Sequence, residues 1–249
     1  MGNFDDTIIA DDKPISDLES LQFYQTQAHP CSYLYGESAR TIFLNPKQKI
    51  DNAVYSQLSE FGFRRSGQHI YKPMCQQCKA CIPLRVPVDT FEATRRQKRT
   101  LKRNKDVIIK AVSTINTDEH YALYHRYITE RHADGDMYPP TKEQFLSFLA
   151  DKWASVNYYE YRVEGRLIAV SVADIMDNGV SAIYTYFDPS ETQRSLGRFV
   201  ILSLIKLAKK KNLPCVYLGY WIKSSEKMRY KSEYRPLEIL IDDRWLRVL

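Results

Sequence analysis

Apolar residues follow a helical period in the first part of the chain. Ile50, Val54, Leu58 and Phe61 recur every three or four positions, which predicts a helix over residues 47–63. The segment before it is rich in turn-forming residues and is expected to be extended and irregular.

Two further segments repeat this helical period, and each begins with a threonine. Residues 117–132 start with Thr117, and residues 141–153 start with Thr141, with acidic residues close behind in both cases. A threonine side chain can accept a hydrogen bond from the unpaired N–H groups of a first turn, and acids there favour the helix. Both segments are therefore predicted to be helices.

The period then changes to two, which predicts a sheet. Residues 156–189 indicate three strands with turns at Glu164-Gly165 and Asn178-Gly179, and Asn-Gly between β-rich runs is a strong hairpin signal. A long helix over residues 190–214 and a strand over residues 215–222 follow, and the tail is expected to be irregular.

Two segments upstream of these helices are short and distinctive. Residues 82–91 alternate like a strand, and Pro83 and Pro87 predict an edge position because proline cannot donate to a central ladder. Residues 94–106 are compatible with a helix.

This order of elements predicts an α/β (α+β) fold with an acetyltransferase-like (GNAT-like) mixed sheet flanked by helices. We expect a smaller N-terminal, Cys-containing and basic region over residues 1–110 and the acetyltransferase-like domain over residues 111–249. In such a fold, the loop before the long helix offers backbone N–H groups to a ligand. Here that loop, "SETQRSLGR", has a single glycine, which argues against a coenzyme A cofactor.

Composition narrows the class of protein. A chain of 249 residues with 44% hydrophobic and 27% charged residues is typical of a soluble globular protein. No apolar run approaches the roughly 18–20 residues of a membrane span, and the acidic N-terminus does not resemble a secretory signal, so we expect no membrane partner. The net charge of +6 is compatible with a polyanionic partner. Five cysteines, three of them clustered, indicate a reducing, cytoplasmic compartment.

The clustered cysteines predict a metal or cluster site. Cys75, Cys78 and Cys81 form C-x-x-C-x-x-C, and a structural zinc site needs four ligands. Candidates for the fourth are Cys31, which we favour, and His29 and His69. An iron–sulfur cluster is the competing interpretation, although the terminal Cys-Pro of a ferredoxin motif is absent. The alternative to both is a set of buried, metal-free thiols; Cys215 is expected to be such a core residue.

A basic run follows the cysteines. The window from residue 95 to 105 contains no acidic residue and seven basic ones: Arg95, Arg96, Lys98, Arg99, Lys102, Arg103 and Lys105. Like charges on one helix repel each other, so an anionic partner such as a phosphate backbone is expected to compensate them. The alternative is a solvated face, or one neutralised by the acidic N-terminal segment.

Aromatic and basic residues alternate near the C-terminus. Residues 217–240 interleave Tyr217, Tyr220, Trp221, Tyr230 and Tyr234 with Lys223, Lys227, Arg229, Lys231 and Arg235. This pattern suits stacking on a base together with phosphate or carboxylate contacts. A packed core edge with snorkelling lysines would give the same composition.

Three stretches together resemble the aminoacyl-tRNA–protein transferases of the N-degron pathway. They are residues 64–104, 181–205 and 217–240, and they include "RRSG…YKP" at Arg64–Pro73 and "KMRYKSEYRP" at Lys227–Pro236. The resemblance extends over roughly residues 29–240. The short length and the cysteine pattern resemble the bacterial aspartate/glutamate leucyltransferases. The longer arginyl-transferases carry a C-x-x-C near the N-terminus, where this chain has "CSYLYG". Members of that branch are described as binding a metal or an iron–sulfur cluster through such cysteines, and the cysteine pattern of this chain departs from theirs.

The resemblance implies that leucine is transferred from leucyl-tRNA to the N-terminal Asp or Glu of acceptor proteins, which marks them for degradation. This reaction is the aminolysis of an activated ester, and it requires no cofactor for its chemistry. Three alternatives remain open: an arginyl-tRNA–protein transferase, an acetyl-CoA-dependent N-acetyltransferase, and a zinc-dependent RNA-binding module.

The implied roles can be assigned to residues. The seven basic residues of the run are expected to bind tRNA. Lys227, Tyr230, Lys231 and Arg235 are expected to bind the acceptor, and Tyr184, Tyr186 and Trp221 to line an aminoacyl pocket. Asp174, a lone acid among apolar residues, is the predicted proton acceptor; its alternative is an exposed edge-strand acid or a structural partner of an arginine.

Overall fold

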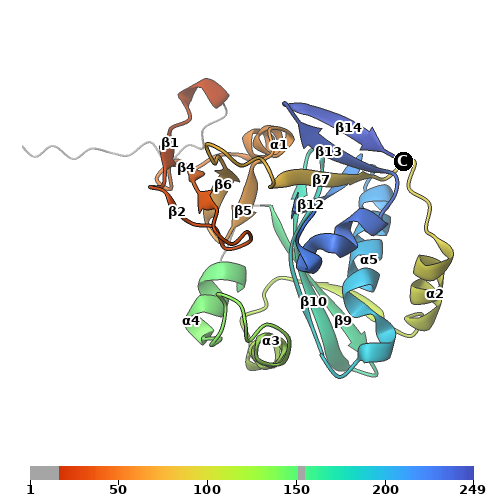
Figure 1. Cartoon of the computed structure of the whole chain (residues 1–249). Helices are drawn as coiled ribbons and strands as arrows, with labels where there is room; N and C mark the ends of the chain where they lie inside the picture. The colour runs from red at the N-terminus through yellow and green to blue at the C-terminus, as the bar shows by residue number, and fades with distance from the viewer. Residues whose placement is uncertain (1–16, 151–154) are drawn as a thin grey trace, which may run out of the picture.

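The computed structural model describes residues 17–150 and 155–249, and two sheets form its framework (Figure 1). The N-terminal sheet has the order β1 (Phe23–Gln25), β4 (Thr41–Leu44), β6 (His69–Pro73) and β5 (Arg64–Ser66). A short ribbon pairs β2 (His29–Pro30) with β3 (Ser38–Ala39).

The large sheet contains eight strands. Its order is β14 (Arg244–Val248), β13 (Leu237–Ile241), β7 (Ile82–Pro87), β12 (Cys215–Trp221), β11 (Gly179–Phe187), β10 (Arg166–Met176), β9 (Val156–Val163) and β8 (Ile108–Val112). Figure 1 shows α5 (Leu196–Lys210) and α2 (Arg95–Arg103) on one side of this sheet. On the other side lie the N-terminal sheet, α1 (Asn52–Glu60), α3 (Asp118–Arg131) and α4 (Lys142–Phe145).

Short helical turns complete the chain. They are η1 (Leu18–Ser20), the π-helical turn η2 (Leu146–Ala150), η3 (Thr192–Arg194) and η4 (Glu226–Glu233). Three apolar clusters hold the layers together, one under α5, one under α3 and α4, and one between α1 and the large sheet.

The local signals of the sequence are realised as predicted. Thr117 and Thr141 both cap their helices by accepting a hydrogen bond from a backbone N–H three residues on. The turns at Glu164-Gly165 and Asn178-Gly179 separate β9, β10 and β11. The α/β class with a mixed sheet flanked by helices is therefore confirmed. The last part of the segment 141–153 lies outside the described residues.

The edge position predicted for residues 82–91 is wrong, because β7 lies between β13 and β12. Its pairing with β13 involves only Leu84 and Arg85, so neither proline has to donate to that neighbour. On the other side, Pro83 lies opposite Tyr220, where the register of β12 shifts, and Pro87 lies at the end of the ladder. Bulges and strand ends are the places where a sheet tolerates proline.

The C-terminal tail is not irregular, as had been predicted. It forms η4 and then the hairpin β13–β14, whose first strand pairs with β7. The predicted boundary at residue 110 stays a prediction, and β7, which precedes it, belongs to the large sheet together with strands that follow it.

The strands β11 and β12 form a parallel pair that opens along its length. Only Val180 and Ser181 pair with β12, opposite Val216 and Tyr217. Beyond this point the register of β12 shifts, and Gly219 has a φ of 75°, a conformation that favours glycine. The two strands therefore diverge toward their C-terminal ends, and this is where an open α/β sheet offers space for ligands.

Candidate functional site

Lys231 lies at the opening between β11 and β12. It belongs to η4, and its ammonium donates a hydrogen bond to the carbonyl oxygen of Tyr220 at 2.5 Å. The ammonium also lies 3.8 Å from the position that a Cβ on Gly219 would occupy, which is an ordinary van der Waals distance. Burial, with a smaller contribution from the positive charge of Arg64, lowers the pKa of Lys231 to about 8. A cation is thus held against the bulge of β12.

Arg64 brings a second positive charge to the same place. It lies on β5, is only 4% exposed, and uses Nη1 to donate to the backbone oxygens of Ser59 and Phe63. Its guanidinium carbon lies over the rings of Tyr217 and Tyr220, at 4.9 and 5.9 Å from their centroids. In the part of the chain that the structure describes, Nε and Nη2 of Arg64 are buried without a hydrogen-bond partner.

The four predicted acceptor-binding residues do not all lie at this opening. Lys227 is 65% exposed and forms an ion pair with Asp134 at 2.7 Å, which links η4 to the segment after α3. Tyr230 is 45% exposed. Arg235 points to the chain end, where it donates to the backbone oxygen of Leu249. The structure thus brings Lys231, rather than Arg235, next to Arg64.

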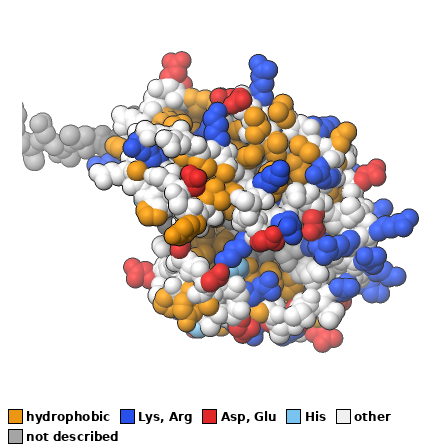
Figure 2. Space-filling model, in the orientation of Figure 1, with side chains coloured by type: hydrophobic (Ala, Val, Ile, Leu, Met, Phe, Trp, Pro, Cys, Tyr) orange, Lys and Arg blue, Asp and Glu red, His pale blue; other side chains and the backbone are white. Residues whose placement is uncertain are grey.

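Figure 2 shows that this face of the molecule is hollowed between the N-terminal strands above and the α3–α4 region below. The Lys227–Asp134 ion pair connects η4 to the loop that follows α3.

The three residues predicted for an aminoacyl pocket divide between two apolar clusters. Tyr186 is fully buried in the cluster under α3, 5.7 Å from the ring of Tyr124. Tyr184 packs at the edge of the same cluster, and its hydroxyl donates to Sδ of Met137 at 3.4 Å. Burial raises the pKa of both phenols. Trp221 packs instead against the cluster under α5, so the structure brings Tyr184 and Tyr186 together but not Trp221.

Asp174 has the environment of a structural ion pair. It is fully buried on β10, and its two carboxylate oxygens accept hydrogen bonds from Nε and Nη2 of Arg65, each at 2.7 Å. The hydroxyl of Tyr55 donates a further hydrogen bond at 2.7 Å. A proton acceptor must reach its substrate, so we interpret Asp174 as the structural partner of an arginine, the second interpretation given for it above.

The basic run forms an exposed helix, α2. Thr94 and Gln97 close its first turn as a capping box, and the side chains of all seven predicted tRNA-binding residues are exposed. Figure 2 shows basic side chains gathered on the side of the molecule where Figure 1 draws α2. This surface can offer a phosphate backbone many cations at once.

Side chains of α2 hold the loop that precedes α5. Arg103 donates to the backbone oxygen of Gln193, and Asn104 donates to that of Arg194 at 2.8 Å. Arg194 returns to pair with Asp106 at 2.8 Å. The loop at the N-terminus of α5 is therefore fixed by side chains from the end of α2 and from the turn that follows it.

The same helix also reaches η4. Gln97, itself buried, donates to the backbone oxygen of Glu233 at 3.1 Å, and the Glu233 carboxylate lies 2.9 Å from Arg198 and 3.8 Å from Arg96. Because Glu233 is two residues from Lys231, the basic helix and the Lys231 region form one connected framework.

The four cysteines predicted as ligands line one cavity of about 310 Å³: Cys31, Cys75, Cys78 and Cys81. Neither His29 nor His69 is among the described residues that line it. Partial burial, with the neighbouring thiols of Cys31, Cys75 and Cys78 adding to it, raises the pKa of Cys81 to about 11. Cys215 is buried in the core below α1, as predicted.

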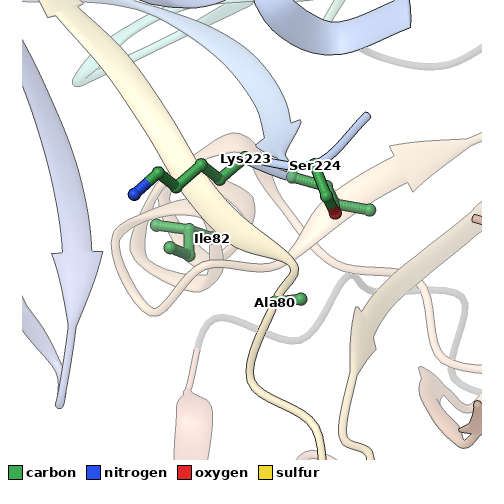
Figure 3. A pocket seen from close by; sticks show the side chains of 5 residues that line it. Ala80, Ile82, Lys223 and Ser224 are labelled. Carbon is green, nitrogen blue, oxygen red and sulfur yellow. The ribbon is translucent and has the colours of Figure 1, made fainter. Parts of the chain in front are cut away.

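The donor chemistry of this cavity fits a thiophilic metal, because four cysteines line one space. The cysteine side chains are not arranged as a formed metal site. Residues 17–150 and 155–249 contain no group of three or more His, Cys, Asp or Glu side chains arranged to hold a metal ion. A second cavity, of about 420 Å³, adjoins the cysteine loop and is drawn in Figure 3. It is lined by Ala80, Ile82, Ile222, Lys223 and Ser224, none of which belongs to the predicted aminoacyl pocket.

Arg64, which the structure places beside Lys231, is not among the site residues predicted from the sequence. The stretch "RRSG" contributes to the family resemblance, but two adjacent arginines look alike in a sequence. Only the fold distinguishes Arg65, which pairs with Asp174, from Arg64, which faces Tyr217 and Tyr220.

Comparisons with known proteins cover most of the chain. Residues 29–99 match the family model described as arginine-tRNA-protein transferase, N terminus, and residues 119–241 match the corresponding C-terminus model. An aspartate/glutamate leucyltransferase of Stutzerimonas stutzeri is 53% identical over 232 residues, which are 93% of this chain and 99% of that protein. The protein with the same name from Saccharophagus degradans is 51% identical over 233 residues, again 93% and 99% of the two chains.

Similarity to solved structures is weaker. FemX is 9% identical with a TM-score of 0.47, over 86% of this chain and 85% of that chain. The ribosomal-protein-S18-alanine N-acetyltransferase of Escherichia coli is 17% identical with a TM-score of 0.39, over 51% and 74%. Among the described residues, no helix is long and apolar enough to cross a membrane.

Proposed function

This chain belongs to the aminoacyl-tRNA–protein transferases, and we propose that it transfers leucine from leucyl-tRNA to the N-terminal Asp or Glu of acceptor proteins. The observation that carries the proposal is the identity of 53% over nearly the whole length of a relative named aspartate/glutamate leucyltransferase. The transfer would mark the acceptor for degradation. We also propose that the reaction takes place in the cytoplasm, because its donor is a charged tRNA.

The reaction exchanges an ester for an amide. The neutral α-amino group of the acceptor attacks the leucyl carbonyl carbon, a C–N bond forms, and the bond from that carbon to the tRNA ribose oxygen breaks. The ribose oxygen leaves with a proton as a hydroxyl. Because an α-amino group has a pKa of about 7.7–8.0, much of it is already neutral near pH 7.5, and positioning of the two substrates supplies most of the rate.

Three surfaces share the binding. The exposed cations of α2 would bind the tRNA, and Lys231 together with Lys227 and Tyr230 would bind the acceptor near the opening of β11 and β12. Arg235 remains a candidate from the sequence, although its contact with Leu249 directs it to the chain end. The link through Gln97 and Glu233 supports a shared framework, because it would hold the tRNA surface at a fixed position relative to the acceptor site.

Tyr184 and Tyr186 remain the proposed lining for the leucyl side chain. Tyr184 is partly exposed at the edge of the cluster under α3, whereas Tyr186 backs it from the interior. Trp221 packs against the cluster under α5 and would contribute only by shaping the end of β12.

The cysteine quartet would hold a structural metal, with zinc favoured over an iron–sulfur cluster. Four thiol groups around one cavity support this assignment, and zinc prefers four sulfur ligands in structural sites. Such a metal would tie the segment before β3 to the segment before β7. The transfer chemistry itself requires no cofactor.

The acetyltransferase alternative is less well supported. The loop before α5, which would have to receive the pyrophosphate of coenzyme A, is held by Arg103, Asn104 and Asp106 instead. Added acetyl-CoA is therefore expected to leave the thermal stability unchanged.

A transfer assay tests the proposal. Radiolabelled leucyl-, arginyl- or phenylalanyl-tRNA is offered with peptides that differ only in residue one. We expect transfer from leucyl-tRNA to peptides beginning with Asp or Glu. Preference for arginyl-tRNA, or acceptance of N-terminal Lys or Arg with rejection of Asp, would overturn it.

A further inference from the structure

Arg64 and Arg65 are neighbours on β5, and they use the Nε–Nη2 edge of the guanidinium group differently. Arg65 directs Nε and Nη2 at the carboxylate of Asp174, forming two hydrogen bonds of 2.7 Å. Arg64 directs Nη1 at two backbone oxygens, while its own Nε and Nη2 have no partner among the residues that the structure describes. This edge presents two parallel N–H groups, the arrangement that binds a carboxylate through both oxygens.

The surroundings of Arg64 favour the binding of an anion. It is 4% exposed, and the described residues place no carboxylate within ion-pair distance of it. Buried charges are normally paired, because leaving water costs a cation several kcal/mol. Lys231 is a second cation near this position, and its pKa is lowered by burial and by the charge of Arg64. Two cations held together in the interior attract a single negative charge strongly.

The shape of the site favours a side-chain carboxylate over a phosphate. The rings of Tyr217 and Tyr220 flank the guanidinium at 4.9 and 5.9 Å, so little space remains around it. A carboxylate on one or two methylene groups is smaller than a phosphodiester, which carries a ribose on either side. Because Nε and Nη2 are both buried, the side chains around them would have to move to admit a carboxylate. Lys231 is partly exposed and therefore extends the site from Arg64 toward the surface.

We propose that the Nε–Nη2 edge of Arg64, together with the ammonium of Lys231, is the receptor for the side-chain carboxylate of the acceptor's N-terminal residue. The inference rests on the proposed function and adds the residue that would select acidic acceptors. The amide of Asn or Gln has the same shape but no charge, and its NH₂ group would face the N–H groups of Arg64. Discrimination between acids and amides would thus come from Arg64.

The test compares Arg64→Gln and Arg64→Lys with the matched control Arg65→Gln. For each variant, kcat/KM for leucyl transfer is measured with peptides that begin with Asp or with Asn, and the ratio of the two values is compared with that of the wild type. We expect Arg64→Gln to lower the ratio roughly 100-fold, the discrimination that a hydrogen-bonded charge pair provides. Arg64→Lys keeps the charge but loses the paired N–H groups, and a drop of roughly 10-fold is expected. Arg65→Gln removes a structural ion pair and should lower both values equally.

A wild-type ratio in Arg64→Gln would overturn the inference. So would an equal loss for both peptides together with weaker binding of leucyl-tRNA, because Arg64 would then hold a phosphate. If Arg64 variants do not fold, the wild-type protein still gives an answer through the arginine Nε–H signals in an NMR spectrum. A buried Nε–H signal should move on addition of the dipeptide Asp-Ala and stay in place with Asn-Ala, and no movement with either would overturn the inference. Absence of any leucyl transfer by the wild type would contradict the proposed function, while the NMR experiment would still report on the carboxylate site.

Discussion

Arg65 and Asp174 form a buried ion pair with two hydrogen bonds of 2.7 Å, and it joins β5 of the N-terminal sheet to β10 of the large sheet. Neither side chain is more than 3% exposed. Such a pair contributes to the relative position of the two sheets, and Arg64 is the adjacent residue on the same strand. This contact takes no part in the proposed chemistry, and Arg64 is held separately by its own hydrogen bonds to the backbone oxygens of Ser59 and Phe63.

Removing Asp174 is expected to destabilise the fold. Asp174→Ala leaves the Arg65 guanidinium buried without its carboxylate, and breaking a buried pair in this way costs about 3–5 kcal/mol. Urea denaturation measures the loss. The double variant Arg65→Met with Asp174→Leu should recover much of it, because apolar groups then replace both charges. An Asp174→Asn protein that is as stable as the wild type but inactive in transfer would instead make Asp174 a catalytic group.

The contrast between Arg65 and Arg64 shows how far the sequence could be interpreted. Capping threonines, Asn-Gly turns and helical periods act over a few residues, so α3, α4, β10 and β11 could be predicted. The central position of β7 and the partner of Asp174 depend on segments more than a hundred residues away, and no local pattern carries that information. The basic helix was recognisable from its charges alone, whereas the opening between β11 and β12 required the register of the sheet.

Charge reversal on α2 should weaken tRNA binding. Arg99→Glu with Lys102→Glu replaces two exposed cations, so fewer counterions are released when the tRNA binds. The affinity should fall. The slope of log affinity against log salt concentration should become less steep by about 2–4. Binding isotherms at several salt concentrations measure both quantities.

A control variant of equal charge change separates a local site from overall charge. Arg244→Glu with Arg247→Glu alters two exposed arginines on β14. If α2 is the binding surface, the control should keep a salt slope close to that of the wild type. Equal effects of both double variants would show that net charge, rather than the helix, governs binding.

The cysteine quartet should be needed for metal content. We expect protein purified without oxygen to contain about one zinc ion per chain, the number that four thiolate ligands hold. Cys75→Ser and Cys78→Ser should lower that content and the melting temperature, whereas Cys215→Ala, in a different cluster, should keep the metal. Metal analysis and an absorbance spectrum decide between zinc and an iron–sulfur cluster. Wild-type stability and transfer in Cys75→Ser, with no metal in either protein, would leave these cysteines as packing residues.

Zinc removal should also change the acidity of the thiols. The pKa of Cys81 is raised to about 11 by burial and by the other three thiols, so the metal-free protein keeps this group protonated at pH 8. A bound metal requires thiolates, so binding should release protons and weaken as the pH falls. Titration of the metal-free protein with zinc in a weakly buffered solution measures the proton release. Zinc uptake without proton release would contradict the arrangement.

Lys231→Met is expected to stabilise the protein while lowering its activity. Burial holds the pKa of Lys231 at about 8 instead of 10.5, so between these values the unfolded chain binds more protons than the folded one. The stability cost of this group is therefore complete below pH 8 and disappears as the pH rises toward 10.5. Removing the charge should raise the melting temperature at pH 7 by about 2–4 °C, with a smaller gain at pH 9. A gain that does not depend on pH would show that packing, rather than charge, is responsible.

The same group should shape the pH dependence of transfer. As the pH rises, kcat/KM should first increase, because the acceptor's α-amino group, with a pKa of about 7.7–8.0, becomes neutral. It should then decrease as Lys231, with a pKa of about 8, loses the charge that attracts the acidic acceptor. Lys231→Arg keeps its charge at all these pH values, so the decrease should shift to higher pH while the initial increase stays in place. The initial increase serves as the internal control, because it belongs to the peptide. If the decrease stays at the same pH in Lys231→Arg, the group that titrates there is not Lys231, and the acceptor's carboxylate is held by other cations.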